Sequence, residues 1–208
     1  DNLLRHNLRN DMNVILGHAD TSLSGAGPET ATSMRKILET GEELLSTASK
    51  DRQIVDVLVD VDSTTRLDFA DIVRETADGM VDAHPDATIT IDVPDEAHVV
   101  ALPKVRSAVR ELLENALQHA SADAKIHLEV RVHDGTVELQ IHDNAPRIPE
   151  NEIEPLFSDC EPDAVSHGTG LGLWLVYWVV DLSEGMLTFD HAENTGNVVT
   201  VMLPRTDD

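Results

Sequence analysis

The chain has 208 residues, of which 41% are hydrophobic and 3% aromatic, so a folded core built mainly from aliphatic side chains is expected. Its 39 acidic and 15 basic residues give a formal net charge of -24, which argues against nucleic acid and anionic membrane surfaces as partners. The acidic residues are dispersed among periodic apolar ones, and we interpret them as an adaptation to a salty cytoplasm. The single cysteine, Cys160, excludes an internal disulfide and agrees with a cytoplasmic location. No apolar run reaches the roughly 18 residues of a membrane span, so no direct membrane contact is expected.

Residues 1–60 show helical periodicity in two stretches separated by Gly25-Ala-Gly-Pro28. The apolar positions of the first stretch recur every three or four residues, at Leu4, Leu8, Met12, Ile15, Ala19 and Leu23. A helical hairpin of this kind leaves an apolar stripe uncovered, and a second copy of the chain covers it as a four-helix bundle. The pattern therefore predicts a homodimer.

Residues 61–208 show a different pattern, in which short alternating runs are mixed with helical stretches. We expect strands at 88–93, 125–132, 136–141, 186–189 and 197–203, and helices at 69–82, 102–119 and 171–182. Asp134-Gly135 is expected to form the turn of a hairpin. This order predicts an α+β fold: an α/β sandwich with helices over one face of a mixed sheet.

His6 lies on the first predicted helix, roughly 150° from the centre of its apolar stripe, and is therefore expected to face solvent. Neutral imidazole accepts phosphoryl groups near neutral pH. Asn10 follows one helical turn later, beside His6, where its amide can hold a water molecule. Taken alone, His6 fits an idle surface histidine better, because the chain has 10 histidines.

Three segments in the second half have the chemistry of a nucleotide site. Glu111 and Asn115 lie four residues apart on one helix face, which suits Mg²⁺ and its waters. Asp143-Asn144 follows a strand, where a carboxylate can accept a hydrogen bond from an amino group. Gly168-Thr-Gly-Leu-Gly172 opens an apolar helix, where backbone N–H groups bind phosphate. Each segment alone also fits an ordinary turn, loop or surface helix.

Together these segments resemble the catalytic core of sensor histidine kinases, notably those of halophilic archaea. His6-Asn-Leu-Arg-Asn-Asp-Met12 resembles the phosphoacceptor box, and the later segments resemble the ATP-binding domain shared with gyrase B, Hsp90 and MutL. The resemblance implies a dimerisation and histidine-phosphotransfer hairpin at 1–60 and an ATP-binding domain at 61–208. It also implies autophosphorylation of His6 with ATP and Mg²⁺, transfer to an aspartate of a response-regulator receiver domain, and a phosphatase reaction.

Site roles follow from the resemblance residue by residue. His6, Asn7, Asn10 and Glu111 would serve catalysis, and Asn115 and Glu111 would hold Mg²⁺. The nucleotide would be bound by Asn115, His119, Asp143, Asn144, Arg147, Gly168, Thr169, Gly170, Leu171 and Gly172. Pro155-Leu-Phe157 resembles the F box, and residues 158–167 the lid over the nucleotide.

Among the departures of the chain from the family pattern, three lie in the phosphoacceptor box and the first glycine box. Asn7 replaces a carboxylate that accepts a proton, and Ala145 and Arg147 replace glycines of the first glycine box. These departures suggest one alternative, a dimeric signalling scaffold with a weakened nucleotide pocket. A second alternative is an ATPase or serine kinase of the same superfamily, which would not need His6.

Overall fold

The computed structural model describes residues 15–16, 19, 30–32, 34–38, 41, 63–120, 123–157, 171–192 and 196–206. The chain divides into two compact units, and the named helices and strands lie in the second, residues 54–165 and 172–208, except for Leu171, the first residue of α6. In the first unit the described residues between 15 and 41 are all helical, and Ala19 is buried. The predicted hairpin and bundle otherwise lie outside the described residues, as do His6, Asn7 and Asn10. They remain predictions, as does the domain boundary at residue 60.

The second unit is built on a five-stranded mixed sheet with the strand order β2-β4-β5-β7-β6. The strands are β2 (Thr88–Asp92), β4 (Lys125–Val132), β5 (Thr136–Asp143), β6 (Met186–Ala192) and β7 (Gly196–Pro204). β2 and β4 are parallel and the other neighbours antiparallel. β4 and β5 form the expected hairpin, whose turn places Gly135 at a positive φ of 90°. β5 lies in the middle of the sheet, so its end is surrounded by protein on both sides.

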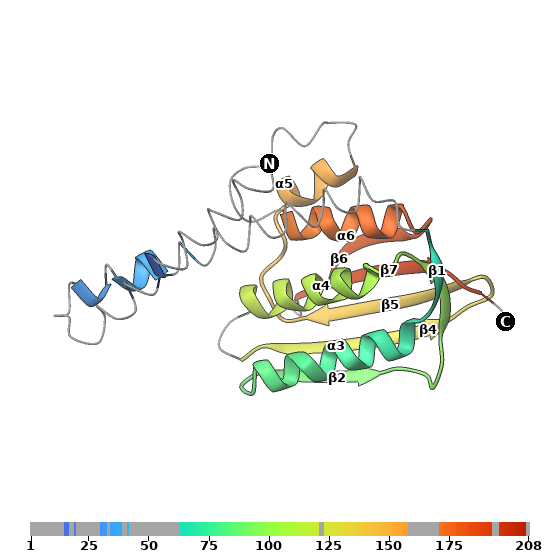
Figure 1. Cartoon of the computed structure of the whole chain (residues 1–208), viewed down its shortest axis with the longest axis horizontal. Coiled ribbons are helices and arrows are strands. Elements are labelled where there is room, and N and C mark those ends of the chain that lie inside the picture. The colour runs from blue at the N-terminus through green and yellow to red at the C-terminus, as the bar shows by residue number, and fades with distance from the viewer. Residues whose placement is uncertain are drawn as a thin grey trace. The chain divides into compact units, whose positions relative to one another are not determined.

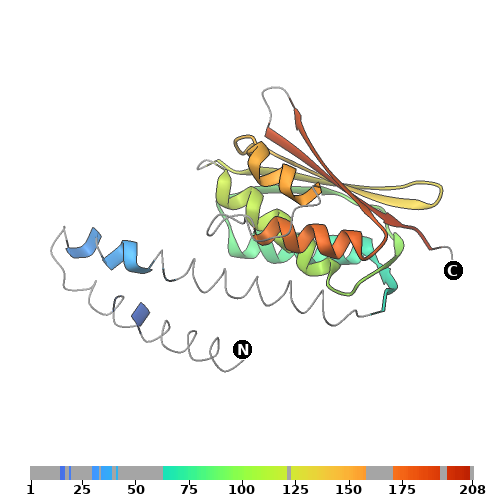
Figure 2. The ribbon, with the colours of Figure 1, turned by 90° about the horizontal axis from the view of Figure 1, so that it is seen from above.

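Three helices cover one face of this sheet: α3 (Phe69–Ala83), α4 (Val105–His119) and α6 (Leu171–Asp181) (Figures 1 and 2). Alternate residues of β4 and β5 are buried beneath them, as the period-two pattern of the sequence requires. The core includes Phe69, Leu113, Leu128, Leu139, Ile141, Leu175 and Leu203. The predicted fold class, an α/β sandwich with helices on one face of a mixed sheet, is confirmed.

Four short elements had no counterpart in the sequence prediction. β1 (Thr65–Asp68) and β3 (His98–Ala101) pair antiparallel as a separate two-stranded sheet, and α5 (Glu150–Ile153) and the 3₁₀ helix η1 (Glu154–Phe157) follow the end of β5.

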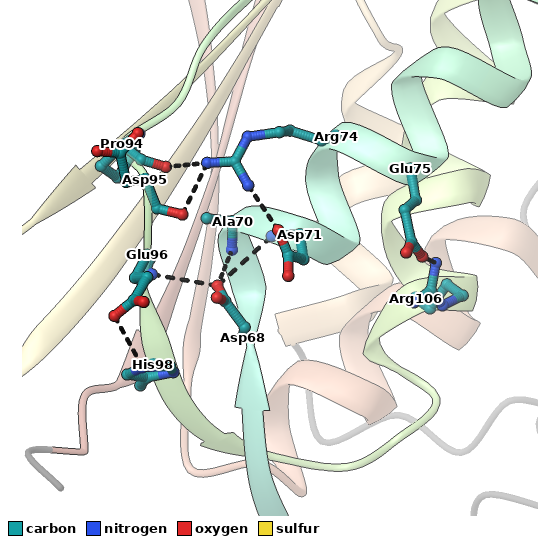
Figure 3. Close-up of polar contacts among 11 residues, drawn as sticks. Asp68, Ala70, Asp71, Arg74, Glu75, Pro94, Asp95, Glu96, His98 and Arg106 are labelled. Atoms are coloured by element: carbon teal, nitrogen blue, oxygen red, sulfur yellow. Dashed lines mark hydrogen bonds and ion pairs between the residues drawn. The ribbon is translucent and has the colours of Figure 1, made fainter.

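The N-terminus of α3 is tied to the segment before β3 (Figure 3). Asp68 caps the helix through Oδ1, which accepts hydrogen bonds from Ala70 N at 3.0 Å and from Ala97 N at 3.2 Å. Arg74 donates to the carbonyls of Pro94 and Asp95. These contacts fix how α3 lies beside β3.

α4 begins at Val105 rather than at Leu102, where the prediction placed its start. Pro103 disfavours helical backbone at the residue before it, and Leu102 N instead donates to Ser183 Oγ at 3.0 Å. The C-terminal end of α6 is capped by two backbone hydrogen bonds: Gly185 N donates to Val180 O and Glu184 N to Asp181 O, each at 2.9 Å. Within the described residues, no helix has the length and apolar character needed to cross a bilayer.

Candidate functional site

The candidate site lies where the end of β5 and helix α4 supply polar groups. α4 packs against β5, and its buried apolar residues include Ala108, Leu112 and Ala116. Glu111 is only 6% exposed on this helix, and Asn115, one turn later, is half-buried. A carboxylate and an amide one turn apart offer the oxygen ligands that Mg²⁺ prefers, so the donor set fits this ion. His119 lies a further turn along and is exposed.

Asp143 is the last residue of β5 and is 8% exposed. Its two carboxylate oxygens have different surroundings. Oδ1 accepts hydrogen bonds from Ala145 N at 2.8 Å, Asn197 Nδ2 at 3.0 Å and Asn197 N at 3.2 Å. From the described residues, Oδ2 receives no hydrogen bond. The carboxylate is therefore held in one orientation, with Oδ2 as its remaining acceptor.

The loop after Asp143 is held in place although it lacks the glycines that the family pattern has there. Ala145 is buried, and neither it nor Arg147 adopts a positive φ, since Glu184 is the only non-glycine residue with one in the described part of the chain. The backbone strain that alanine and arginine would suffer in a left-handed conformation is thus absent at both positions. Replacement of the glycines leaves an ordered loop.

Asn144 points its amide away from Asp143 and into the backbone of the neighbouring strand. Its Oδ1 accepts a hydrogen bond from Lys125 N at 2.9 Å, and its Nδ2 donates to Asp123 O at 2.7 Å. These two contacts give Asn144 a structural role at the start of β4.

The candidate phosphate-binding cations differ in their surroundings. Arg147 Nη2 pairs with Glu150 Oε1 at 2.7 Å and Arg106 Nη1 with Glu75 Oε2 at 2.6 Å, both on the surface. Arg110 and His119 are exposed and have no ion pair with any residue that the structure describes. Surface pairs of this kind contribute about 0–1 kcal/mol, so Arg147 can exchange Glu150 for another anion at small cost.

The glycine-rich segment is described only from its end. Gly168, Thr169 and Gly170 lie outside the described residues, whereas Leu171 and Gly172 form the first turn of α6. Phe157, from η1, is 54% exposed and packs edge-on against Tyr177 of α6 and Phe189 of β6. The F box is therefore joined to the helix that follows the lid segment by aromatic contacts.

Asn197 is a site residue that the sequence did not reveal. It lies on β7, is 4% exposed, and contacts Asp143 together with the loop that follows it. Asparagine within a strand carries no local signal for such a role, and Asp143 is 54 residues away along the chain.

Comparison with known proteins agrees with this fold. The family model described as "Histidine kinase-, DNA gyrase B-, and HSP90-like ATPase" matches residues 100–207, just over half of the chain. Sensor protein KdpD of Escherichia coli (strain K12) is 23% identical over 211 residues, which cover 97% of this chain and 24% of KdpD. The probable sensor histidine kinase TcrY of Mycobacterium tuberculosis is 28% identical over 203 residues, covering 88% of this chain and 41% of TcrY.

Solved structures give the same fold. The ATP binding domain of PrrB from Mycobacterium tuberculosis matches 70% of this chain and all of that domain, with a TM-score of 0.57 and 24% identity. The chain thus spans less than half the length of the two curated relatives above. A particular resemblance to kinases of halophilic archaea is not shown by these comparisons and stays a prediction.

Proposed function

Because the chain belongs to the histidine kinase-, DNA gyrase B- and HSP90-like ATPase family, we propose that it is the catalytic core of a sensor histidine kinase. In this proposal it transfers the γ-phosphoryl group of ATP to His6 and then to an aspartate of a response-regulator receiver domain. The observation that carries the proposal is the Asp143 carboxylate, fixed at the end of β5 beside the helix that bears Glu111 and Asn115. The relatives named as sensor kinases support it.

Nucleotide binding divides among the elements of the site. Asp143 Oδ2 accepts a hydrogen bond from the adenine amino group, and backbone N–H groups of Gly168, Thr169, Gly170, Leu171 and Gly172 bind the phosphates. Asn115 and Glu111 would hold Mg²⁺, which supplies neutralisation of phosphate charge when bound. His119 and Arg147 add positive charge. Asn144 has an indirect role, because its side chain holds the start of β4 beside Asp143.

The phosphoryl transfer itself takes place on the first unit. A ring nitrogen of His6 attacks the γ-phosphorus, the bond to the ADP oxygen breaks, and the imidazole proton passes to a base. Asn7 has an amide and cannot be that base, so we assign the role to Glu111 or to solvent. Asn10 would orient the water molecule of the phosphatase reaction. Action as a homodimer in the cytoplasm, on a receiver domain, is part of the same proposal.

The alternative of a degenerate scaffold was suggested by Ala145, Arg147 and Asn7. The structure weakens its main argument, because the loop that lacks glycines is free of positive φ angles and tied to Asp143. An ATPase or serine kinase of the same superfamily would not need His6, and this difference allows a direct test.

The test is incubation with γ-labelled ATP and Mg²⁺ in high salt, followed by acid and alkali treatment of the labelled protein. We expect label that is labile in acid and stable in alkali, lost in His6→Gln and retained in His133→Gln, a substitution of an exposed histidine of the β4–β5 hairpin. Acid-stable label would indicate a hydroxyl acceptor and a serine kinase. ATP binding without label or hydrolysis would indicate the scaffold, and hydrolysis without label an ATPase.

A further inference from the structure

Asn197 makes four hydrogen bonds to a single segment, residues 143–148. Its Nδ2 donates to Asp143 Oδ1 and to Pro146 O, each at 3.0 Å, and its Oδ1 accepts from Ile148 N at 3.0 Å. Its backbone N–H also donates to Asp143 Oδ1, at 3.2 Å. The side chain is buried, so these are bonds made in a medium of low dielectric constant and are costly to lose.

The residue before it lets Asn197 come this close. Gly196 has a φ of 104°, and a Cβ there would overlap the carbonyl group of Asp143 and come within 2.8 Å of Asn144 Cα. Glycine thus allows the start of β7 to lie directly against the end of β5. Gly196 and Asn197 together form a clamp on the Asp143 loop.

The clamp limits how many carboxylate oxygens Asp143 can present to a ligand. A carboxylate that is free to rotate presents both oxygens and can accept two parallel hydrogen bonds, as from the N1–H and 2-amino groups of guanine. In this site the donors of Asn197 and Ala145 occupy Oδ1, so a single oxygen of Asp143 remains for the base. One fixed acceptor suits the 6-amino group of adenine and repels the 6-oxo group of guanine.

We infer that Asn197 is a positioning residue that makes the site selective for adenine over guanine nucleotides by fixing the Asp143 carboxylate. This inference rests on the proposed function, because it takes the ligand of Asp143 to be the base of a nucleotide. Asn197 contacts Asp143 and its loop, and acts on the base only through them.

The test compares two substitutions of nearly equal shape, both suited to a strand: Asn197→Val and Asn197→Thr. Titration calorimetry with Mg·ATP and Mg·GTP gives the ratio of the two affinities. The valine variant lacks any side-chain donor to Oδ1, and we expect its ATP/GTP ratio to fall at least about tenfold. The threonine hydroxyl can still donate to Oδ1, so this variant should keep the ratio within about threefold.

A control separates selectivity from stability. Ser183→Ala removes another buried hydrogen-bonding side chain, whose Oγ accepts from Leu102 N and donates to Val179 O, away from the Asp143 loop in the contacts it makes. It should lower the unfolding temperature and leave the ATP/GTP ratio unchanged. If valine lowers both affinities in parallel, or if threonine behaves as valine does, Asn197 is only a structural residue.

Two further outcomes are distinguishable. Should Asn197→Val fail to fold, the smaller pair Asn197→Ala and Asn197→Ser asks the same question with less steric change. A wild-type chain that binds neither nucleotide would refute the proposed ATP site and this inference with it. A wild-type chain that binds ATP, with variants whose ratio is unchanged, would overturn the role of Asn197 alone.

Discussion

At Asp143 the two carboxylate oxygens are unequal, and this makes the effect of a single atom exchange predictable. In Asp143→Asn the three donors at Oδ1 select the amide oxygen for that position, so the new NH₂ group takes the place of Oδ2. A donor then faces the adenine amino group. We expect the ATP affinity to fall about 10- to 100-fold, the equivalent of a charged hydrogen bond worth about 1.5–3 kcal/mol.

The same exchange should favour a base with an acceptor at that place. Inosine triphosphate, which has a 6-oxo group, should lose less affinity than ATP in the variant, and calorimetry with both nucleotides measures the difference. Asp123→Asn makes the same chemical change on an exposed carboxylate and serves as the control. Equal ATP affinity in wild type and Asp143→Asn would show that this carboxylate does not contact the base.

The second prediction at this scale compares two glycines, one with no space for a Cβ and one with open space around it. Gly196→Ala puts a Cβ into the backbone of Asp143 at a φ of 104°, and we expect a loss of at least about 2 kcal/mol in the free energy of unfolding. Gly79→Ala lies in α3 with nothing within 4 Å of the new atom, and should gain about 0.5–1 kcal/mol. Urea unfolding of both variants measures these values. A neutral Gly196→Ala would mean that β7 does not lie against Asp143 as described.

At the scale of the element, the cap that follows helix α6 contains a residue with an unfavourable backbone conformation. Replacing this residue is therefore predicted to stabilise the fold. The bonds from Gly185 N to Val180 O and from Glu184 N to Asp181 O form a Schellman motif, in which Glu184 has the position that glycine favours, with a φ of 56°. Glu184→Gly should therefore raise the free energy of unfolding by about 0.5–1 kcal/mol. Gly185 must stay, because a Cβ there would lie 2.5 Å from Met202 O.

Glu184→Ala is the matched control for this prediction, since it removes the same charge but keeps a Cβ in the left-handed conformation. Chemical denaturation should show no comparable gain for the alanine variant. If alanine stabilises as much as glycine, the gain comes from the lost negative charge rather than from the backbone.

The elements that the sequence predicted correctly are those whose signal is local and long enough. β4 has the bounds expected from its alternation, and α3 and α6 end within one residue of theirs. β1 and β3 have four residues each, too few for a period to appear in the sequence. They form because the two segments, far apart in the sequence, pair with each other, with Thr65 opposite Ala101. The early start assigned to α4 overlooked the effect of Pro103 on Leu102.

The candidate site divides in the same way. Glu111 with Asn115, and Asp143, could be proposed from the sequence because the spacing and the strand end are local signals, and their roles stay predictions. The direction of the Asn144 amide and the clamp by Asn197 depend on strands that neighbour β5 in the sheet but not in the sequence. His6, Asn7 and Asn10 lie outside the described residues and rest on sequence alone.

At the scale of the whole molecule, the chain has too few basic residues to neutralise its acidic ones. With 15 basic residues against 39 acidic ones, at least 24 acidic side chains must lack a basic partner of their own, since 39 − 15 = 24. α3 illustrates this, because Asp78 and Asp82 lie near its C-terminal end, where no basic residue offsets the helix dipole. Such self-repulsion destabilises the compact state at low ionic strength.

Added salt should therefore stabilise the chain. Between 0.1 and 1 M KCl the Debye length falls from about 10 to about 3 Å, and we expect the unfolding temperature to rise by roughly 5 °C or more, or about 2 kcal/mol at this chain length. Thermal unfolding followed by circular dichroism measures the change.

The triple variant Asp78→Asn, Asp82→Asn, Asp86→Asn removes three exposed negative charges and makes the net charge less negative, -21 instead of -24, since -24 + 3 = -21. It should be more stable than the wild type at 0.1 M and gain less from KCl, because less repulsion remains to be screened. An equal gain in both proteins would show that salt acts by exclusion from the protein surface, and the interpretation of the acidic surface as a salt adaptation would then lose its electrostatic basis.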